Sequence, residues 1–233
     1  MSCKWNQRKV RDMDFFVEFS PITIQPQEIE LKSFEMIEEE IGNHSFSEEQ
    51  FPIVKRVIHT TADFELGRSL RFHPEAVKAG IFAIRQGKKI VTDVEMVKAG
   101  IHQSRITHFG GQIICHIRDE DIVKEAKEQN ITRSILAMQK ATSQIEGGIF
   151  AIGNAPTALL ELIRLVKLGK AKPDLIIGVP VGFVSAKEAK EELQKLDVPY
   201  ITNQGRKGGS PVAAAIVNAL SLMAQQVNRD ENE

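Results

Sequence analysis

The chain has 233 residues, of which 42% are hydrophobic and 26% are charged, and its formal net charge is −1. This composition is typical of a globular protein with a substantial buried core. Because the charge is nearly balanced, it gives no reason to expect a nucleic-acid or membrane-surface partner, and any anion site has to be local.

The two cysteines, Cys3 and Cys115, lie far apart and form no C-x-x-C pair. This spacing predicts neither a disulfide framework nor a zinc site. The N-terminus lacks the apolar core of a signal peptide, and no apolar run reaches membrane-spanning length. We therefore expect a cytoplasmic protein without a membrane partner.

Three regions are predicted along the chain. Residues 1–25 contain Pro21 and show little periodicity, so we interpret them as an N-terminal extension. Residues 26–226 are predicted to form a single domain, and residues 227–233 a polar C-terminal tail.

The first half of the domain shows helical spacing. Apolar residues recur on one face of the segment 27–41, which predicts a helix. Ser47 followed by Gln50 is a capping-box pattern, and it predicts a second helix that runs towards His59. A third helix is predicted after Pro74, ending near Gly87.

From residue 89 onward, short apolar or β-branched runs alternate with helical stretches. The runs are KIVTD (89–93), QIICHI (112–117), GIFAIGN (148–154), DLIIGVP (174–180) and PYITNQG (199–205). Runs that are apolar on both faces and separated by helices form a parallel sheet that is covered on both sides. The pattern therefore predicts a three-layer α/β/α sandwich with about five parallel strands.

Two of the connecting helices have recognisable starts. Asn154 is predicted as the N-cap of a helix over 155–168, and Ser210 as the N-cap of a helix that begins with Pro211. In open parallel sheets, ligands bind beyond the carboxyl ends of the strands. The polar and glycine-rich segments at this edge are Asp93, Asn154, residues 180–182 and residues 203–209.

Each edge segment has a functional and a structural interpretation. In GIFAIGNAPTALLEL, Gly153 permits a sharp turn and the helix start offers N–H groups to an anion, but the motif alone favours an ordinary connection between a strand and a helix. No dinucleotide or P-loop pattern is present. GVPVGFVSAKE is either a packing turn or a surface kept clear for a bulky ligand. Asp93 either faces the edge or caps a helix.

The segment NQGRKGGSPVAAA combines three features that favour an anion. Arg206 and Lys207 are adjacent cations, the glycines allow close backbone approach, and a helix begins directly afterwards. We interpret the segment as a carboxylate or phosphate site, with a solvated loop as the alternative.

His59 lies in RVIHTTADFE, between aliphatic residues and two threonines. No second metal ligand stands at close spacing, and none of the six histidines pairs with another at a spacing typical of a metal site. No metal site is therefore predicted. The residues alone leave open whether His59 is packed or functional.

Six motifs taken together, in order, resemble one family. They are SF in LKSFEMI, RVIHTTADFE, IVTDVEMVKAGI, GIFAIGNAPTALLEL, IIGVPVGFVSAKE and YITNQGRKGGSPVAAAIVNAL. From about residue 27 to residue 224 the chain resembles the precorrin-8X methylmutases, which include the cobalt-precorrin-8 methylmutases. The resemblance implies a flavodoxin-like three-layer sandwich.

The resemblance also implies an isomerase of cobalamin biosynthesis. Such an enzyme moves a methyl group from C-11 to C-12 of (cobalt-)precorrin-8 and gives cobyrinic or hydrogenobyrinic acid. It implies no added cofactor, because the methyl group and any cobalt are carried by the corrinoid substrate. It further implies a homodimer. The motifs do not separate the cobalt-bearing from the metal-free substrate, although we favour the cobalt form.

Residue by residue, the resemblance assigns His59 as the proton donor and acceptor and places Arg56 and Ser33 in contact with the substrate. An imidazole can give and recover a proton near neutral pH. Because the substrate carries many carboxylates, we add Asn154, Arg206 and Lys207 as further substrate-binding residues.

Two other functions remain as alternatives. A non-catalytic corrinoid carrier would keep the same pocket without turnover. A flavodoxin-like nucleotide-binding protein is disfavoured because the phosphate-binding loops are missing.

Overall fold

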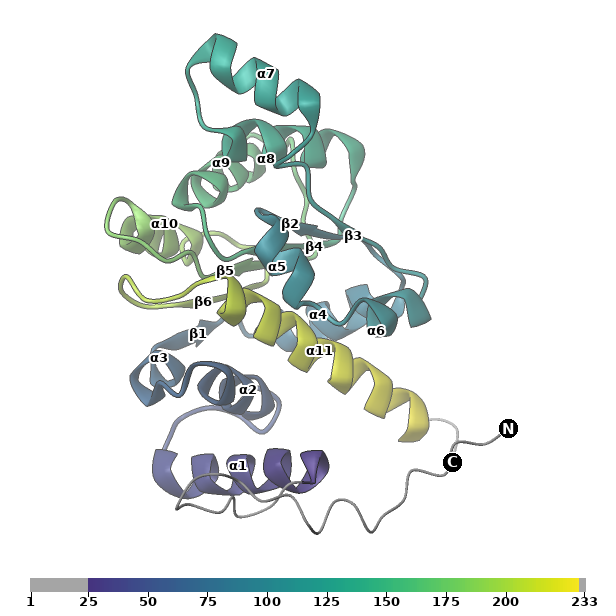
Figure 1. Cartoon of the computed structure of the whole chain (residues 1–233), viewed down its shortest axis with the longest axis vertical. Helices are drawn as coiled ribbons and strands as arrows, with labels where there is room; N and C mark the ends of the chain where they lie inside the picture. The colour runs from purple at the N-terminus through teal and green to yellow at the C-terminus, as the bar shows by residue number, and fades with distance from the viewer. Residues whose placement is uncertain (1–24, 231–233) are drawn as a thin grey trace, which may run out of the picture.

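The computed structural model describes residues 25–230, with side chains up to residue 226 (Figure 1). The predicted N-terminal extension therefore lies, up to residue 24, outside the described residues. Among the described helices, none is both long and apolar enough to cross a membrane. Within the same part of the chain, no three His, Cys, Asp or Glu side chains gather as metal ligands would.

One sheet forms the centre of the domain. Its strands are β1 (Leu70–Phe72), β2 (Ile90–Thr92), β3 (Ile113–Ile114), β4 (Ile149–Ile152), β5 (Leu175–Gly178) and β6 (Tyr200–Asn203). The spatial order is β1-β6-β5-β4-β2-β3. The five predicted strands are all present and mutually parallel, and their order is that of flavodoxin-like folds.

Strand β1 was not predicted. It lies at the edge of the sheet and runs antiparallel to β6, with Leu70 opposite Asn203. The sheet thus has six strands, and only five of them are parallel.

Eleven helices are described. They are α1 (Pro26–Ile41), α2 (Phe51–Thr61), α3 (Phe64–Arg68), α4 (Ala76–Arg85), α5 (Glu95–Gly100), α6 (Gln103–His108), α7 (Glu120–Gln129), α8 (Arg133–Gln144), α9 (Pro156–Lys167), α10 (Ala186–Leu193) and α11 (Ser210–Asp230). The predicted helices over 27–41, towards His59 and after Pro74 correspond to α1, α2 and α4. Helix α11 includes Ser210, the predicted N-cap, and continues to Asp230, so the first residues of the predicted tail are helical.

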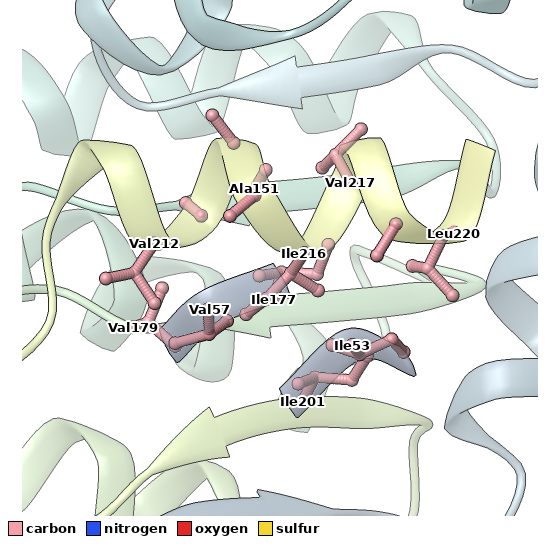
Figure 2. Close-up of a cluster of buried hydrophobic side chains, with 14 of the residues drawn as sticks. Ile53, Val57, Ala151, Ile177, Val179, Ile201, Val212, Ile216, Val217 and Leu220 are labelled. Carbon is pink, nitrogen blue, oxygen red and sulfur yellow. The ribbon is translucent and has the colours of Figure 1, made fainter. Parts of the chain in front are cut away.

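Alternating side chains of the strands face two different hydrophobic cores. In β4, Ile149 and Ala151 belong to the core beneath α2, α4, α5 and α11, whereas Phe150 and Ile152 belong to the core beneath α8, α9 and α10. Figure 2 shows the first core, where Ile216 of α11 is fully buried beside strands β4 and β5 and helix α2. Each such aliphatic side chain contributes about 1.5–3 kcal/mol through burial. The three predicted layers are confirmed.

Helix α2 carries the predicted catalytic histidine, and both of its ends are fixed locally. The Ser47 N–H donates to Gln50 Oε1 (3.2 Å) and the Gln50 N–H to Ser47 Oγ (3.3 Å), as the capping-box pattern predicts. The helix ends at Ala62, which adopts a left-handed conformation with φ 50°. Asp63 then caps α3 by accepting the Leu66 N–H (2.8 Å).

Candidate active site

His59 lies on the last turn of α2 and its side chain is exposed. Its ring packs against Phe34 of α1, with the ring centroids 5.3 Å apart. Val57 and Ile58, its neighbours in sequence, are buried in the core. The amphipathic spacing of α2 therefore anchors the helix on one side and presents the imidazole to solvent on the other.

Arg56, one turn before His59, belongs to the same cluster. Its guanidinium stacks on the Phe34 ring at 4.8 Å from the centroid and forms an ion pair with Glu30 of α1. The hydrogen bond from Arg56 lowers the pKa of Glu30. Arg105 of α6 also acts on Glu30 electrostatically, and partial burial lowers the pKa of Arg105 itself.

Ser33 is half-buried on α1 beside Phe34. Its hydroxyl donates to the Ile29 carbonyl (2.7 Å), one turn earlier in the same helix. The oxygen can still accept a hydrogen bond, so Ser33 suits a ligand that donates one. The cluster of Glu30, Ser33, Phe34, Arg56, His59 and Arg105 is called the α1–α2 cluster below.

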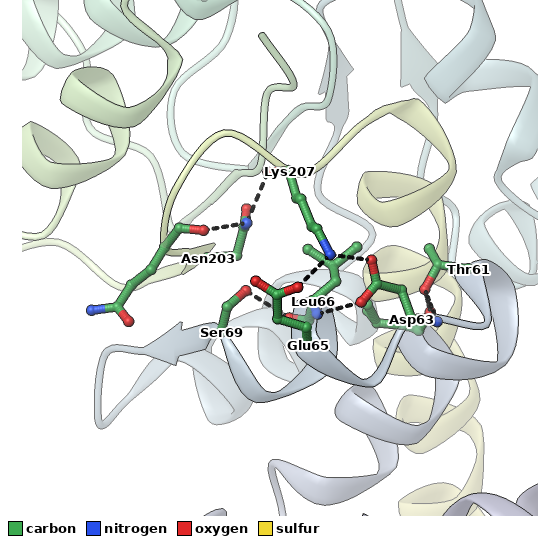
Figure 3. A network of polar contacts seen from close by, with 9 residues as sticks. Thr61, Asp63, Glu65, Leu66, Ser69, Asn203 and Lys207 are labelled. Atoms are coloured by element: carbon green, nitrogen blue, oxygen red, sulfur yellow. Dashed lines mark hydrogen bonds and ion pairs between the residues drawn. The ribbon is translucent and has the colours of Figure 1, made fainter. Parts of the chain in front are cut away.

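Lys207 is not an unoccupied cation as the sequence suggested. Its Nζ donates to Asp63 Oδ2 (2.7 Å) and Glu65 Oε2 (2.8 Å), which follow α2 in the chain (Figure 3). These two carboxylates raise the pKa of Lys207. Lys207 thus joins the β6–α11 loop (residues 204–209) to the segment after His59, and its predicted contact with the substrate stays a prediction.

Arg206 is exposed at the other side of the same loop. Its guanidinium lies over the ring of Phe183, 5.7 Å from the centroid. Phe183 is 86% exposed and Val184 is 82% exposed, in the segment between β5 and α10. The segment GVPVGFVSAKE thus presents apolar side chains next to a cation, which suits a ligand with an apolar face and an acidic edge.

Asp93 binds the backbone N–H groups of the turn between β4 and α9. Its buried carboxylate accepts the backbone N–H groups of Gly153 (3.1 Å), Asn154 (2.8 Å) and Ala155 (2.7 Å). Burial raises the pKa of Asp93, and these hydrogen bonds oppose that effect. The prediction that Asn154 is the N-cap is wrong, because the N-cap is Ala155. The N–H groups of Gly153, Asn154 and Ala155 are bound by Asp93, so these three are not free for a substrate anion.

Gly153 has a different role from the one predicted. It does not have positive φ, so the turn does not require glycine for its backbone angles. A Cβ at this position would lie 2.8 Å from Ser210 Cα and 2.9 Å from the Gly209 carbonyl oxygen. Glycine is needed there because the start of α11 approaches closely.

The comparison with known proteins decides the family. A family model described as precorrin-8X methylmutase matches residues 28–223. The cobalt-precorrin-8 methylmutase of Priestia megaterium is 63% identical over 212 residues, covering 91% of this chain and 94% of that protein. The chain belongs to the precorrin-8X methylmutase family.

Further relatives agree. The cobalt-precorrin-8 methylmutase of Leptospira interrogans is 46% identical, covering 88% of this chain and 97% of that protein. The crystal structure of precorrin-8x methyl mutase from Thermus thermophilus superimposes with a TM-score of 0.81 at 39% identity, covering 86% of this chain and 97% of that one. As a member of this family, the chain is a methyl-shifting isomerase of cobalamin biosynthesis.

A hollow of about 700 Å³ lies where the strand order of this methylmutase fold reverses, beyond β2 and β4. Ligands bind at this position in flavodoxin-like sheets. Asn154 lines the hollow together with Val94, Thr132 and Arg133, and Lys127 adds a second cation. The volume is within the range of small-molecule sites. The hollow lies beyond the carboxyl ends of the strands, where a ligand was predicted to bind, but Arg133 was not among the predicted site residues.

A second hollow, of about 600 Å³, lies near β1 and is lined in part by Arg68 and Arg71. Both arginines already have partners. Arg68 donates to the carbonyls of Ile41 and Asn43, and Arg71 donates to Gln204 Oε1 (2.5 Å). Because these guanidinium groups are engaged, the second hollow is less suited to a polyacidic ligand.

The predicted site residues thus fall into three places in the methylmutase. Arg56 and His59 meet at the Phe34 ring, and Ser33 lies on α1 one position before Phe34. Arg206 and Lys207 lie on the β6–α11 loop, which Lys207 connects to the end of α2, and Asn154 lines the hollow at the reversal of strand order. Their roles towards the substrate stay predictions.

Proposed function

We propose that this chain converts (cobalt-)precorrin-8 to its isomer by moving the methyl group from C-11 to C-12, with His59 as proton donor and acceptor. The observation that carries the assignment of His59 is its position, exposed at the end of α2 and packed beside Phe34 and Arg56. Membership of the methylmutase family supplies the reaction class.

The proposed reaction balances within the substrate. The protonated imidazole lends a proton to the conjugated ring system, which makes the ring electron-poor and favours migration of the methyl group. The bond from the methyl carbon to C-11 breaks as the bond to C-12 forms, and the proton then returns to His59. Substrate and product are isomers, so no other reactant is consumed. Proton transfer of this kind contributes about 10²- to 10⁴-fold to the rate.

Arg56 and Ser33 are proposed to hold the substrate next to His59. Within the described residues, Arg56 pairs with Glu30 and Arg105 acts on the same carboxylate electrostatically, so this part of the α1–α2 cluster has two positive charges for one negative charge. A propionate or acetate of the macrocycle can therefore bind there without displacing Glu30. Partial burial of Arg56 strengthens such a contact over one in open solvent.

We propose that Asn154 and Arg206 contact further edges of the corrinoid, Asn154 from the hollow that contains Arg133 and Arg206 from beside Phe183. An aromatic ring next to a guanidinium matches a macrocycle whose face is apolar and whose edge is acidic. Lys207 is assigned an indirect part, because its ammonium is bound by Asp63 and Glu65.

No added cofactor is proposed, since any cobalt arrives inside the substrate. We propose the cobalt-bearing form as the natural substrate, because the relatives from Priestia megaterium and Leptospira interrogans are named as cobalt-precorrin-8 methylmutases. We further propose a cytoplasmic homodimer. Sedimentation at several concentrations tests the dimer, which requires twice the 26.0 kDa of one chain.

Replacement of His59 tests the assignment. We expect His59→Asn to lower turnover of cobalt-precorrin-8 by about 10²-fold or more, because the proton transfer is lost. Binding of the coloured corrinoid product, followed by absorbance titration, should change by less than about threefold. His108→Asn is the control, since this exposed histidine lies on α6 against Phe109.

Two outcomes would contradict the proposal. If His59→Asn turned over like the control, His59 would not be the proton donor. If the wild-type protein bound the corrinoid but never converted cobalt-precorrin-8 or precorrin-8, the chain would be a carrier instead of an isomerase.

A further inference from the structure

Lys190 is a buried cation that the proposed reaction does not use. It lies on the inner face of α10 and is 1% exposed. Lysine is almost never buried to this extent without partners. Burial lowers its pKa to about 8. Burying an ammonium group costs free energy unless hydrogen bonds compensate for the lost water. The hydrogen-bond partners of Lys190 therefore indicate its role.

The partners of Lys190 belong to the end of β6 and the loop that follows. Its Nζ donates to the Lys207 carbonyl (2.7 Å) and to Asn203 Oδ1 (3.2 Å). Asn203 is itself fully buried, and its Nδ2 donates to the carbonyls of Lys207 (2.8 Å) and Gln204 (3.0 Å). The Lys207 carbonyl thus accepts two hydrogen bonds, one from Lys190 and one from Asn203, and Figure 3 shows the one from Asn203.

The same loop is held at two more points. The Gly209 N–H donates to the Val179 carbonyl (2.9 Å), and the Gly182 N–H donates to the Arg206 carbonyl (3.2 Å). Gly208 has φ 149°, and a Cβ there would lie 2.3 Å from the Val179 carbonyl oxygen. The main chain of residues 206–209 is therefore pressed against the segment after β5, which carries Phe183.

The side chain of Lys207 points away from these contacts. Lys190 binds the main-chain carbonyl of Lys207. The side-chain ammonium of Lys207 binds Asp63 and Glu65, at the start of α3. Asp63 follows the last turn of α2, where His59 lies. The Asp63 N–H in turn donates to Thr61 Oγ1 (3.3 Å), on the last turn of α2. A continuous set of polar contacts therefore runs from α10, through the backbone of Lys207 and through Asp63, to the helix that carries the proposed catalytic residue.

We propose that Lys190 is a positioning residue of the active site, which fixes the β6–α11 loop so that Arg206 lies beside Phe183 and Lys207 holds the end of α2. This inference rests on the proposed function for its consequence in substrate binding. Its structural part, the ordering of residues 204–209 by Lys190, does not depend on which reaction the chain catalyses.

The test compares Lys190→Met with Lys187→Met in the full-length protein. Methionine keeps the length and burial of the side chain without the donors. Lys187 lies on the outer face of the same helix, in an exposed pair with Glu191, and serves as the control. We expect Lys190→Met to raise hydrogen exchange of the 204–209 amides about tenfold or more and to leave the amides of β4 unchanged.

Affinity for the corrinoid product should fall about tenfold in Lys190→Met, as for the loss of one charge-assisted hydrogen bond, and remain unchanged in Lys187→Met. Combining Lys190→Met with Arg206→Ala should give less than the sum of the two losses, because both act through the same loop. A residue that only stabilises the fold would give additive losses. If Lys190→Met does not fold, Lys190→Gln, which keeps an amide donor, takes its place.

Unchanged exchange in the loop, or additive losses of affinity, would overturn the inference. The exchange measurement needs no ligand. A wild-type protein that failed to convert the substrate would therefore contradict the proposed function and leave the result on the loop intact.

Discussion

Among single residues near the site, several polar and charged groups already have hydrogen-bond or ion-pair partners within the protein. Asp93 accepts three N–H groups at the end of β4, and Lys207 is bound by two carboxylates. A buried or half-buried polar group without a partner costs about 1–3 kcal/mol, so such groups find partners during folding. We expect the substrate to bind where the described cations outnumber their carboxylate partners, as Arg56 and Arg105 outnumber Glu30.

Arg133 is the residue in the hollow beyond β4 that best suits a corrinoid carboxylate. It lines the hollow with Asn154, and its planar guanidinium can bind a carboxylate through two parallel hydrogen bonds. We expect Arg133→Met to weaken binding of the corrinoid product by about tenfold or more. Lys124→Met is the control, because it removes one positive charge from the neighbouring helix α7 outside this hollow.

Titration of both variants with the product, at low and at moderate salt, checks this prediction. A loss of affinity that is equal in both variants would indicate a long-range effect of charge instead of a contact in the hollow.

At the scale of elements, the sequence was sufficient wherever a pattern is local. The period of apolar residues identified α1, the capping-box pattern identified α2, and the apolar runs identified β2 to β6. Strand β1 was missed because the charged Arg71 interrupts Leu70–Phe72, so the segment forms no apolar run. Its hydrogen bonds come from β6, far along the chain, and no local pattern reveals that pairing.

The same reason limited the prediction of the site. His59, Arg56 and Ser33 were found through a family resemblance, since one exposed histidine on a helix has no distinctive spacing. The partners of Lys207 stand more than 140 residues away in sequence, and no local pattern could reveal that its charge is engaged. The occupation of the Gly153–Ala155 N–H groups by Asp93 is likewise a contact between two separate strand ends.

Asp63 lies at the junction between α2 and α3 and has two roles there. Asp63 caps α3 through Oδ1 and binds Lys207 through Oδ2. Asp63→Asn keeps the cap and weakens the ion pair, whereas Asp63→Ala removes both. We expect Asp63→Ala to cost about 1 kcal/mol more than Asp63→Asn in urea unfolding, because the cap contributes most and exposed ion pairs contribute little.

The pH dependence of the same variants has a defined sign. The hydrogen bond from Lys207 is the main cause that lowers the pKa of Asp63 in the folded protein. Its contribution to stability is therefore present above the ordinary carboxyl pKa and is lost as the pH falls through the lowered value. The difference in unfolding free energy between wild type and Asp63→Asn should shrink on acidification. A difference that grew towards low pH would contradict the pairing with Lys207.

At the scale of the whole molecule, α11 connects the layers to the site. It begins directly after the β6–α11 loop and crosses the face of the sheet beside α2, α4 and α5 (Figure 1). Its side chains from Val212 to Leu220 are largely buried in the core that also holds α2. The position of its first turn thus sets both the packing of the helix that carries His59 and the end of the loop that carries Arg206.

Gly153 is the point where that first turn meets the end of β4. A methyl group there would strike Ser210 Cα and the Gly209 carbonyl, which are backbone atoms and cannot rotate away. We expect Gly153→Ala to lower the unfolding free energy by about 1–3 kcal/mol, as overpacking does. It should also weaken binding of the corrinoid product, because α11, the β6–α11 loop and the N–H groups bound by Asp93 must all shift.

The control for Gly153→Ala is Gly169→Ala, after α9. Nothing lies within 4 Å of an added Cβ at Gly169, and its φ of 68° makes the cost one of backbone strain alone. Stability should therefore fall by about 1–2 kcal/mol in the control as well, but its affinity for the product should equal that of the wild type. Urea unfolding and product titration of both variants separate the two effects. If Gly153→Ala lost stability but bound the product normally, the start of α11 would not control the geometry of the site.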